Sequence, residues 1–319
     1  MRRRRRSCSH FRVTVQNSID HIEVDILHQY LSAAGFSNVK TKKDLMELVR
    51  RVIMEPSEKS FIETDRNSII CEYVRYFSPT TGIVVRGEYD DSNELTLDFY
   101  YPVCRAYNVS TNEYVSVERY SAHEYFAGVC DDPRIGVTLI FDIRNSVDVM
   151  KHMAQEKKDS EEKMTVSFSG LSVSGMVMLP IKKDKKEKLK TEKNASNRNK
   201  LLMAARNGDE NAIESLTLDD IDTYAQLSKK IRNEDVYTLV ESYFMPYGVE
   251  CNLYSIMGEI TDVATEKNSD TEEELYILTL DYNGMAMNIS INKKDLLGEP
   301  MAGRRFKGTV LMQGKVDFN

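Results

Sequence analysis

The residues best suited to chemistry lie close together near the middle of the chain. His123 and Glu124 are followed within ten residues by Cys130, Asp131 and Asp132. Imidazole, thiolate and carboxylate groups can ligate a transition metal, and a histidine beside a carboxylate can act as an acid/base pair. Their spacing matches no metal-ligand template, and the Asp-Asp-Pro sequence after Cys130 is also typical of a turn before a buried strand. His123, Glu124, Asp131 and Asp132 are therefore candidate catalytic residues, for which we expect a structural role.

A second group of polar residues lies near the C-terminus. Arg304, Arg305 and Lys307 surround a phenylalanine in a glycine-flanked strand, and such a cluster on a β-barrel can follow a phosphate backbone. Two other aromatic residues of this region, Tyr276 and Tyr282, have the sequence parity of neighbouring leucines and so are predicted to face the core. Because no stacking platform is visible, nucleic-acid binding is disfavoured. Arg304, Arg305 and Lys307 are kept as candidate ligand-binding residues.

The common catalytic signatures are missing from the sequence. It contains no P-loop, no G-x-G-x-x-G and no G-x-S-x-G sequence, which argues against the usual NTPase, dinucleotide-binding and hydrolase sites. Its five cysteines are far apart and form no C-x-x-C pair. This pattern predicts reduced thiols in a cytoplasmic protein. We expect no metal and no cofactor.

The composition is that of a folded protein. Hydrophobic residues make up 41% and charged residues 29% of 319 positions, a length that favours two domains. The net charge is -7 although residues 2–6 and 182–200 are strongly basic, so the remainder is acidic and repels phosphate backbones and anionic lipids. The longest apolar runs are far shorter than the roughly 20 residues of a membrane span. No segment is expected to cross a membrane.

The basic segment divides the chain. Residues 182–200 carry nine basic and three acidic residues but only two apolar ones, which is typical of a solvated linker. The predicted organisation is a disordered extension at 1–27, an α+β domain at 28–181, the linker at 182–200, and a helical plus small β-barrel domain at 201–319. We expect trypsin to cut the linker first and to leave two separable fragments.

The first half predicts an antiparallel sheet with flanking helices. An apolar stripe at helical spacing predicts a helix over residues 42–54, with Thr41 and Asp44 as its capping box. Residues 147–158 predict another helix. Runs of β-branched and aromatic residues predict strands at 69–77, 82–89, 95–104, 114–120 and 136–143. A last run at 165–180 contains small polar residues and is predicted to form a hairpin.

The second half predicts four short helices followed by strands. The last helix carries a stripe that ends at Phe244, before a proline. Asn283 and Gly284 form a strong type I′ hairpin signal between strands 275–282 and 285–292. A strand at 255–264, a helical turn at 293–297 and two strands within 304–318 complete a five-stranded barrel or meander; the barrel order resembles the oligonucleotide- and oligosaccharide-binding type. Asn268 is expected in a polar loop that tolerates substitution.

Several phrases resemble one known family. They are YLSAAGFS at 30–37, AGVCDD at 127–132, GVTLIF at 136–141, AARNGD at 204–209, MPYGVEC at 245–251 and NKKDLLGEP at 292–300. They are similar to those of a family of clostridial cytoplasmic proteins catalogued as a domain of unknown function. The resemblance runs from about residue 28 to residue 314 and implies a bacterial cytoplasmic protein with a two-part layout. It implies no catalytic residue.

The beginning of the sequence departs from that family. Chains of that family begin with Met-His, followed by an apolar turn and Gly-Phe. In this sequence Leu27 occupies the position of the methionine. A bacterial UUG codon encodes leucine internally and can also initiate translation. We therefore expect that Leu27 is the native start and that residues 1–26 are not part of the working protein.

Three functions follow as hypotheses. The first is a non-enzymatic cytoplasmic protein that binds a protein partner, a second copy of itself or a small ligand. The second is an enzyme with its site near residues 123–132. The third is a nucleic-acid binder that uses the small barrel. Retention of a metal ion that is lost on His123→Ala favours the enzyme, and binding that falls steeply with salt favours the nucleic-acid binder.

Overall fold

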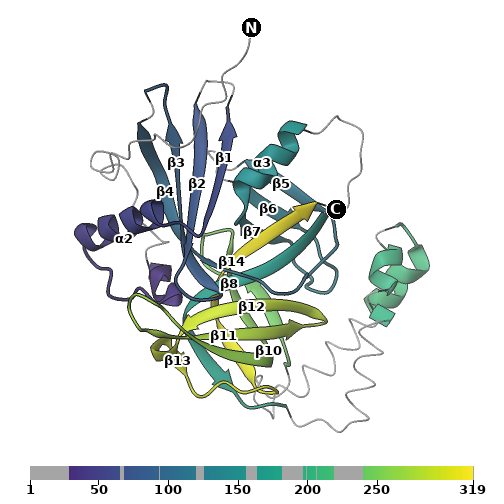
Figure 1. The fold of residues 1–319 in the computed structure, drawn as a ribbon. Helices are drawn as coiled ribbons and strands as arrows, with labels where there is room; N and C mark the ends of the chain where they lie inside the picture. Colours follow the sequence, from purple (N-terminus) through teal and green to yellow (C-terminus); the bar gives the residue numbers. More distant parts are fainter. Residues whose placement is uncertain are drawn as a thin grey trace.

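The protein is described from a computed structural model. The structure describes residues 29–64, 68–92, 94–119, 126–155, 164–181, 197–198, 200–205, 207–218 and 240–318. Most of them lie in strands, with a few helices, so the α+β class is confirmed at this level. Two sheets meet at the centre of the molecule, as Figure 1 shows. Among the described helices, none has the length and apolar character needed to cross a membrane.

The elements follow in this order: η3 Tyr30–Ala34, α2 Lys42–Met54, β1 Glu58–Glu63, β2 Ile69–Tyr76, β3 Thr81–Tyr89, β4 Leu95–Cys104, β5 Val115–Arg119, β6 Phe126–Cys130, β7 Leu139–Ile143, α3 Ser146–Gln155, β8 Met164–Met178, β9 Tyr243–Pro246, β10 Leu253–Lys267, β11 Glu274–Tyr282, β12 Met285–Asn292, η4 Lys293–Asp295, β13 Leu296–Leu297 and β14 Arg305–Phe318. Residues 200–205 and 210–218 are also helical.

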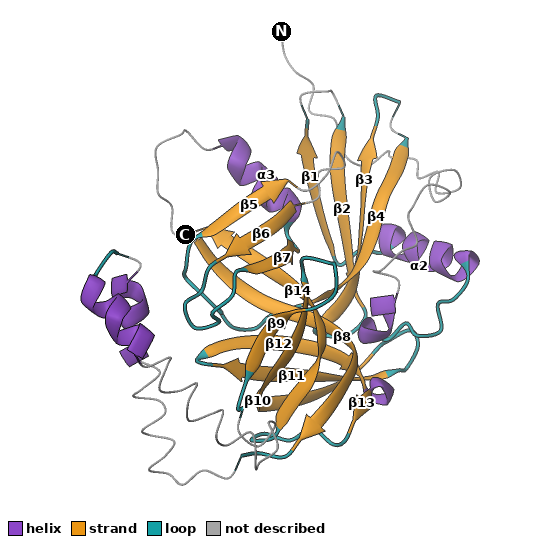
Figure 2. Cartoon of the chain, turned by 180° about the vertical axis from the view of Figure 1, so that it is seen from behind, coloured by secondary structure: helices purple, strands orange, loops and turns teal. Residues whose placement is uncertain are grey.

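The first sheet has four antiparallel strands in the order β1-β2-β3-β4. Helix α2 has the bounds that its apolar stripe predicts, and its capping box is confirmed because Thr41 Oγ1 accepts from the Asp44 amide. The helix buries that stripe against Cys71, Tyr73 and other residues of one face of the sheet. Helix α3 lies near the opposite face, where it contacts β1 and β2 (Figure 2).

The second sheet has ten strands and contains a closed ring of pairings. Strand β8 pairs in parallel with β12 and antiparallel with β14. The remaining pairings are β12 with β11, β11 with β10, and β10 with β14, all antiparallel. The five strands β8, β12, β11, β10 and β14 thus form a cycle with no open edge between them. Beyond the cycle, β14 continues the sheet by pairing with β7, followed by β6 and β5.

The hairpin predicted over residues 165–180 is wrong, because this segment is the single strand β8. Its small residues permit close packing instead of a turn. A Cβ at Gly170 would lie 2.2 Å from Val310 Cγ1, and one at Gly175 would lie 2.4 Å from Phe306 Cε2. Strand β14 is likewise one strand where two were expected over residues 304–318, with a bulge between Gly308 and Val310.

The two sides of the basic segment share one sheet. Strand β8 precedes residues 182–200, whereas β12, β13 and β14 follow them. One hydrophobic cluster also joins side chains of both sides, including Phe141 and Phe168 with Ile289 and Phe306. Two separately folded halves do not describe this arrangement. The linker itself stays a prediction, because residues 182–196 lie outside the described residues.

In the second half of the chain, the turn residues predicted the hairpin correctly. Asn283 and Gly284 have φ angles of 52° and 83°, as a type I′ hairpin requires, and β12 has its predicted bounds. The helix predicted to end at Phe244 is wrong at that end, because Phe244 lies in strand β9, which pairs with β10. Strands β1 and β6 were not predicted.

Asn268 is not in a tolerant loop. Its side chain is fully buried, and its Nδ2 donates to the Ala34 carbonyl oxygen at 2.8 Å. Its Oδ1 accepts from the backbone amides of Asp270 and Thr271. The side chain therefore connects the β10–β11 loop to η3, which packs on the outer side of β12. There Ser290 Oγ donates to the Ala33 carbonyl oxygen at 2.6 Å.

A buried polar relay lies between the first sheet and α3. Glu72 and Arg86 are opposite one another on β2 and β3. Ser146 Oγ donates to Glu72 Oε2 at 2.9 Å and accepts from Arg86 Nη1 at 3.0 Å. All three side chains are buried. Burial is the main cause that raises the pKa of Glu72 to about 7, although Ser146 and Arg86 both act to lower it.

The shared sheet changes the expected outcome of limited proteolysis. The many lysines of residues 182–200 offer trypsin cleavage sites, but β8 and β14 are paired from Arg305–Met178 to Phe318–Met164. We expect the two fragments of a singly nicked chain to co-elute in native size-exclusion chromatography and to separate only in denaturant. Separation of the fragments without denaturant would contradict the shared core.

The relay predicts a pH-dependent stability. Because the pKa of Glu72 is about 7 in the folded protein and 4.5 for the free side chain, the folded state holds a proton that the unfolded state releases. The contribution of Glu72 to the free energy of unfolding is therefore fully present below pH 4.5 and is lost as the pH rises through 7. The loss amounts to roughly 3 kcal/mol. Glu72→Gln should flatten this part of the curve, measured by urea unfolding between about pH 5 and about pH 8. Glu88→Gln, at a partly exposed position of β3, is the control; an unchanged slope in Glu72→Gln would disprove the assignment.

Candidate functional site

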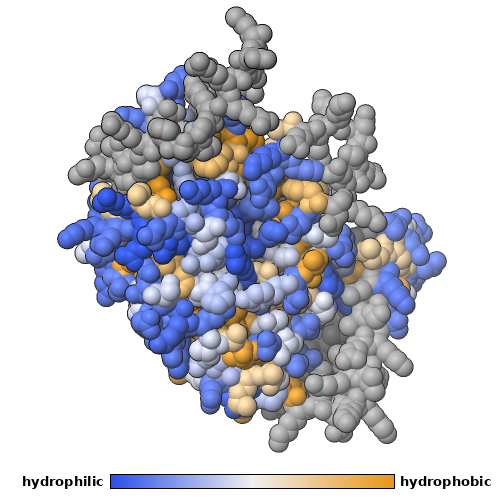
Figure 3. Space-filling view, in the orientation of Figure 1, coloured by the Kyte–Doolittle hydropathy of each residue, from blue (hydrophilic) through white to orange (hydrophobic). Residues whose placement is uncertain are grey.

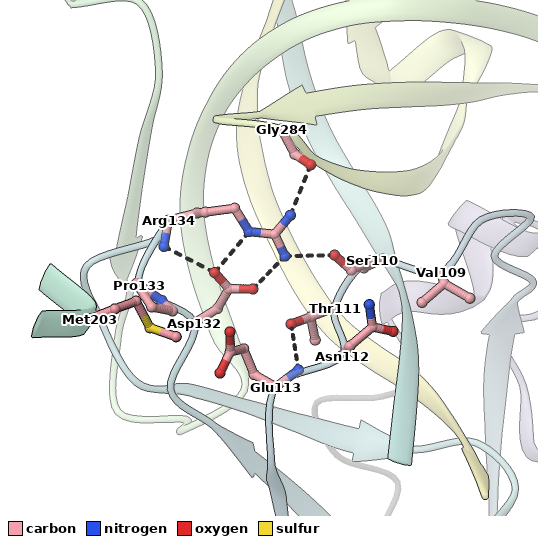
Figure 4. Close-up of a pocket in the computed structure, with 10 residues that line it drawn as sticks. All are labelled: Val109, Ser110, Thr111, Asn112, Glu113, Asp132, Pro133, Arg134, Met203 and Gly284. Carbon is pink, nitrogen blue, oxygen red and sulfur yellow. Dashed lines mark hydrogen bonds and ion pairs between the residues drawn. The ribbon is translucent and has the colours of Figure 1, made fainter. Parts of the chain in front are cut away.

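A polar pocket of about 390 Å³ opens where three loops meet. One loop connects β4 to β5, the second connects β6 to β7, and the third is the β11–β12 turn; a residue of the helical segment 200–205 completes the lining (Figure 4). The lining residues are Val109, Ser110, Thr111, Asn112, Glu113, Asp132, Pro133, Arg134, Met203 and Gly284. Asp132, a candidate from the sequence, therefore does lie at a pocket.

Arg134 holds the three loops together. Its Nε and Nη2 donate to the two carboxylate oxygens of Asp132, at 2.9 and 2.5 Å. Its Nη2 also donates to the Ser110 carbonyl oxygen at 2.8 Å, and Nη1 donates to the Gly284 carbonyl oxygen at 2.9 Å. Asn283 Nδ2 donates in return to the Arg134 carbonyl oxygen. A guanidinium that donates two hydrogen bonds to one carboxylate fixes the distance and the orientation between the two groups. We therefore call the Arg134 side chain, with its bonds to Asp132, Ser110 and Gly284, the clamp.

The clamp sets the charge state of Asp132. Burial acts to raise the pKa of this carboxyl, but hydrogen bonds from the Arg134 side chain and backbone and from Thr111 outweigh it and hold the pKa below its ordinary value. Asp132 is thus a carboxylate whose oxygens are already occupied. A general acid or base works best with a pKa near the operating pH and with access to substrate. Asp132 has neither property.

The β4–β5 loop is held against the ring. The Ser110 and Thr111 amides donate to the Val166 carbonyl oxygen of β8, and Val166 donates back to the Thr111 carbonyl oxygen. Ser110 Oγ also donates to the Ala286 carbonyl oxygen of β12 at 2.6 Å and accepts from the Phe168 amide. The pocket wall is therefore anchored to two strands of the ring, which limits its freedom to move.

Glu113 is the remaining charged side chain of the pocket. Its amide donates to Thr111 Oγ1 at 3.1 Å, and its carboxylate points into the pocket beside Asp132 (Figure 4). Among the described residues, none is seen to donate a hydrogen bond to that carboxylate. Because Arg134 compensates Asp132, the pocket lined by these three side chains has a net negative charge.

The other candidates near Asp132 do not assemble with it into a catalytic group. His123 and Glu124 lie outside the described residues. Asp131 accepts from Thr138 Oγ1 at 2.5 Å and does not line the pocket. The buried thiol of Cys130 has a pKa raised to about 12, mainly by burial, so it remains protonated. Within the described part of the chain, no group of three or more His, Cys, Asp or Glu side chains is placed to hold a metal ion.

The C-terminal candidates are separated by the structure. Arg305 is buried and donates to the carbonyl oxygens of Leu179 and Val240, at 3.1 and 2.7 Å. These bonds favour a structural role, and ligand binding by Arg305 stays a prediction. Arg304 donates to the Glu299 carbonyl oxygen. Lys307 lines a second recess, which also contains Lys294.

Sequence patterns did not identify the other residues that shape the pocket. Arg134 follows Asp132 by two positions, a spacing that is common in turns, and its long-range partners are backbone carbonyl groups without side-chain identity. Glu113 and Thr111 lie in a polar loop that has no motif. The bridge between Thr111 and Val166 and the bonds of Ser110 to β8 and β12 place that loop at the ring, and such long-range contacts leave no trace in local sequence.

Comparison with known proteins identifies one family. Residues 31–314 match the family model described as a domain of unknown function from an E. rectale gene, DUF3881. No curated protein and no solved structure matches the chain. The resemblance to a family of unknown function from clostridial organisms is thereby confirmed.

Removal of the clamp tests its structural role. Arg134→Met leaves the buried Asp132 carboxylate without its partner, so we expect a loss of about 3 kcal/mol of unfolding free energy near neutral pH. The pKa of Asp132 is lowered in the folded protein, so this stabilisation is present above the unfolded pKa of about 3.9 and is lost as the pH falls through the lower folded value. The difference between wild type and variant should narrow in acid.

The control for this experiment is Arg304→Met, since Arg304 binds a single carbonyl oxygen near the surface. It should cost about 1 kcal/mol or less. Equal losses for the two arginine variants, measured by urea unfolding, would remove the special role of Arg134.

Proposed function

The chain belongs to the DUF3881 family of domains of unknown function, and from this premise we propose that it is a non-enzymatic protein that binds a small cationic ligand. The proposed site is the pocket between residues 109–113 and 132–134. The observation that carries the proposal is the pairing of Arg134 with Asp132, because the pocket is lined by one guanidinium and two carboxylates and the additional carboxylate of Glu113 gives it a net negative charge.

The size and polarity of the pocket support a small ligand. A volume of about 390 Å³ lies within the range of about 300–1,000 Å³ for small-molecule sites. Glu113 supplies a carboxylate, and the neighbouring Asn112 supplies an amide that can accept or donate. An ammonium or guanidinium group offers the donors that a carboxylate requires. The acidic character of most of the chain favours the approach of a cation.

The enzyme hypothesis has less support. It requires an acid, base or nucleophile within reach of a substrate, whereas the Asp132 oxygens are occupied and Cys130 is buried. His123 and Glu124 keep their status as candidates, since they lie outside the described residues. Zinc or manganese that copurifies with the protein and is lost on His123→Ala would favour this alternative.

We also propose that the ring of five strands is a barrel of the oligonucleotide- and oligosaccharide-binding type with a permuted order. Strands β10, β11 and β12, the turn η4 and strand β14 follow the order of such a barrel, and β8 takes the place of the fifth strand. Barrels of this type bind oligonucleotides on the face of their second and third strands. Here η3 and the β4–β5 loop contact that face at Ser290 and Asn288, which disfavours nucleic-acid binding there.

A cytoplasmic location is part of the proposal. Cys71, Cys104 and Cys130 are buried and form no disulfide. Unpaired cysteines are typical of reducing compartments.

The ligand class can be tested with three four-carbon probes. Putrescine carries two ammonium groups, succinate two carboxylates and 1,4-butanediol two hydroxyl groups. We expect calorimetric titration of the full chain to show binding of putrescine alone. Glu113→Gln should weaken that binding about tenfold or more, since a hydrogen bond to a charged group contributes roughly 1.5–3 kcal/mol.

Glu118→Gln provides the matched control, because Glu118 is an exposed carboxylate of β5 that does not line the pocket. It should leave the affinity for putrescine unchanged. Failure of putrescine to bind, or equal binding by wild type and Glu113→Gln, would reject the proposed site.

A further inference from the structure

A second recess lies on the outer side of the ring, away from the pocket of Arg134. Its volume is about 430 Å³, and its walls come from β8, β10, β14 and the segment of η4 and β13. The lining residues are Ser174, Gly175, Met176, Ser255, Lys294, Asp295, Leu296, Leu297, Lys307, Gly308 and Thr309. The two pockets have no lining residue in common.

The charged side chains of this recess favour an anion. Lys294 and Lys307 reach it from different elements. Asp295 is the single acidic lining residue, and its Oδ2 accepts from Ser32 Oγ at 2.6 Å, so that oxygen is directed towards η3. Lys294 Nζ lies 3.9 Å from Glu273 Oε2, a distance too long for a strong hydrogen bond. The Lys294 side chain is 53% exposed.

The carboxylate of Glu273 is shared among several donors. Its Oε1 accepts from Ser37 Oγ at 2.6 Å, and its Oε2 accepts from Asn292 Nδ2. Its contact with Lys294 is therefore one of several and is not an exclusive pair. An anion in the recess could then interact with Lys294 without breaking a short ion pair.

The same recess has an apolar side. Leu297 of β13 is opposite Met176 of β8 in the strand register, and the two side chains are 69% and 39% exposed. Figure 3 shows that the visible face is mainly hydrophilic, with small apolar patches. Neighbouring Leu296 is buried and fixes the position of β13. An apolar chain placed beside Met176 and Leu297 would remove both side chains from water.

We propose that this recess binds a small amphiphile, a carboxylate head group on a short apolar chain. The lysine ammonium groups and the hydroxyl groups of Ser174, Ser255 and Thr309 can donate to the head group, and Met176 and Leu297 contact the chain. A macromolecular polyanion is a poorer match, because Asp295 and the apolar side chains interrupt the positive surface.

The test uses three eight-carbon probes with the full chain. Octanoate has the proposed head group, octanol has the same chain without charge, and octylamine reverses the charge. Calorimetric titration at low salt should show octanoate binding at least about tenfold more tightly than octanol, and an excess of octylamine, whose ammonium group suits the other pocket, should not displace octanoate. Added salt should weaken the binding of octanoate, because the lysines are partly exposed.

Lys294→Gln and Lys307→Gln should each weaken octanoate binding about tenfold. Lys293→Gln is the matched control, because Lys293 is adjacent in sequence but pairs with Glu274 and does not line the recess; its affinity should equal that of wild type. Circular dichroism confirms that each variant is folded.

Three outcomes would overturn the proposal. They are the absence of octanoate binding at millimolar concentration, equal affinities for octanoate and octanol, or unchanged affinity in both Lys294→Gln and Lys307→Gln. Because the putrescine pocket has different lining residues, these results leave the first proposal to its own test.

Discussion

The pairing of β8 with β14 is the constraint on which the rest of the structure depends. The two strands are matched from one end of β14 to the other, and β8 also pairs with β12. Without β8, the edges of β12 and β14 would be open, and Val166 and Phe168 would leave the core. Open edges and exposed apolar side chains are both costly. A strand from the first part of the chain thus completes a ring built by the last part.

The same strand positions the candidate site. Val166 and Phe168 of β8 bind the backbone and hydroxyl groups of the β4–β5 loop, and Arg134 links that loop to the turn between β11 and β12. Among the described residues, Arg134 and its partner Asp132 are thereby used to join loops. The pocket beside them is also lined by the carboxylate of Glu113, the group on which the proposed binding of a cation depends.

The sequence predicted structure correctly where neighbouring residues alone determine that structure. The stripe and cap of α2, and the positive φ angles of Asn283 and Gly284, depend on neighbouring residues only. Residues 165–180 were wrongly predicted as a hairpin because the contacts that make them one strand, such as that of Gly170 with Val310, are distant in sequence. For the same reason, the sequence analysis identified Asp132 as a candidate residue but did not identify Arg134 as the partner of Asp132. Arg305 was assigned to a ligand because the carbonyl groups that surround it have no sequence signature.

The most direct test of a shared core is native-state hydrogen exchange of the intact chain, measured amide by amide. If β8 completes the ring, the amides of residues 166–172 should open with the same free energy as those of β12 and β14, and all should lose protection together as denaturant is added. The account would be contradicted if the amides of β8 opened together with those of the first sheet alone, at a lower opening free energy than the amides of β12 and β14.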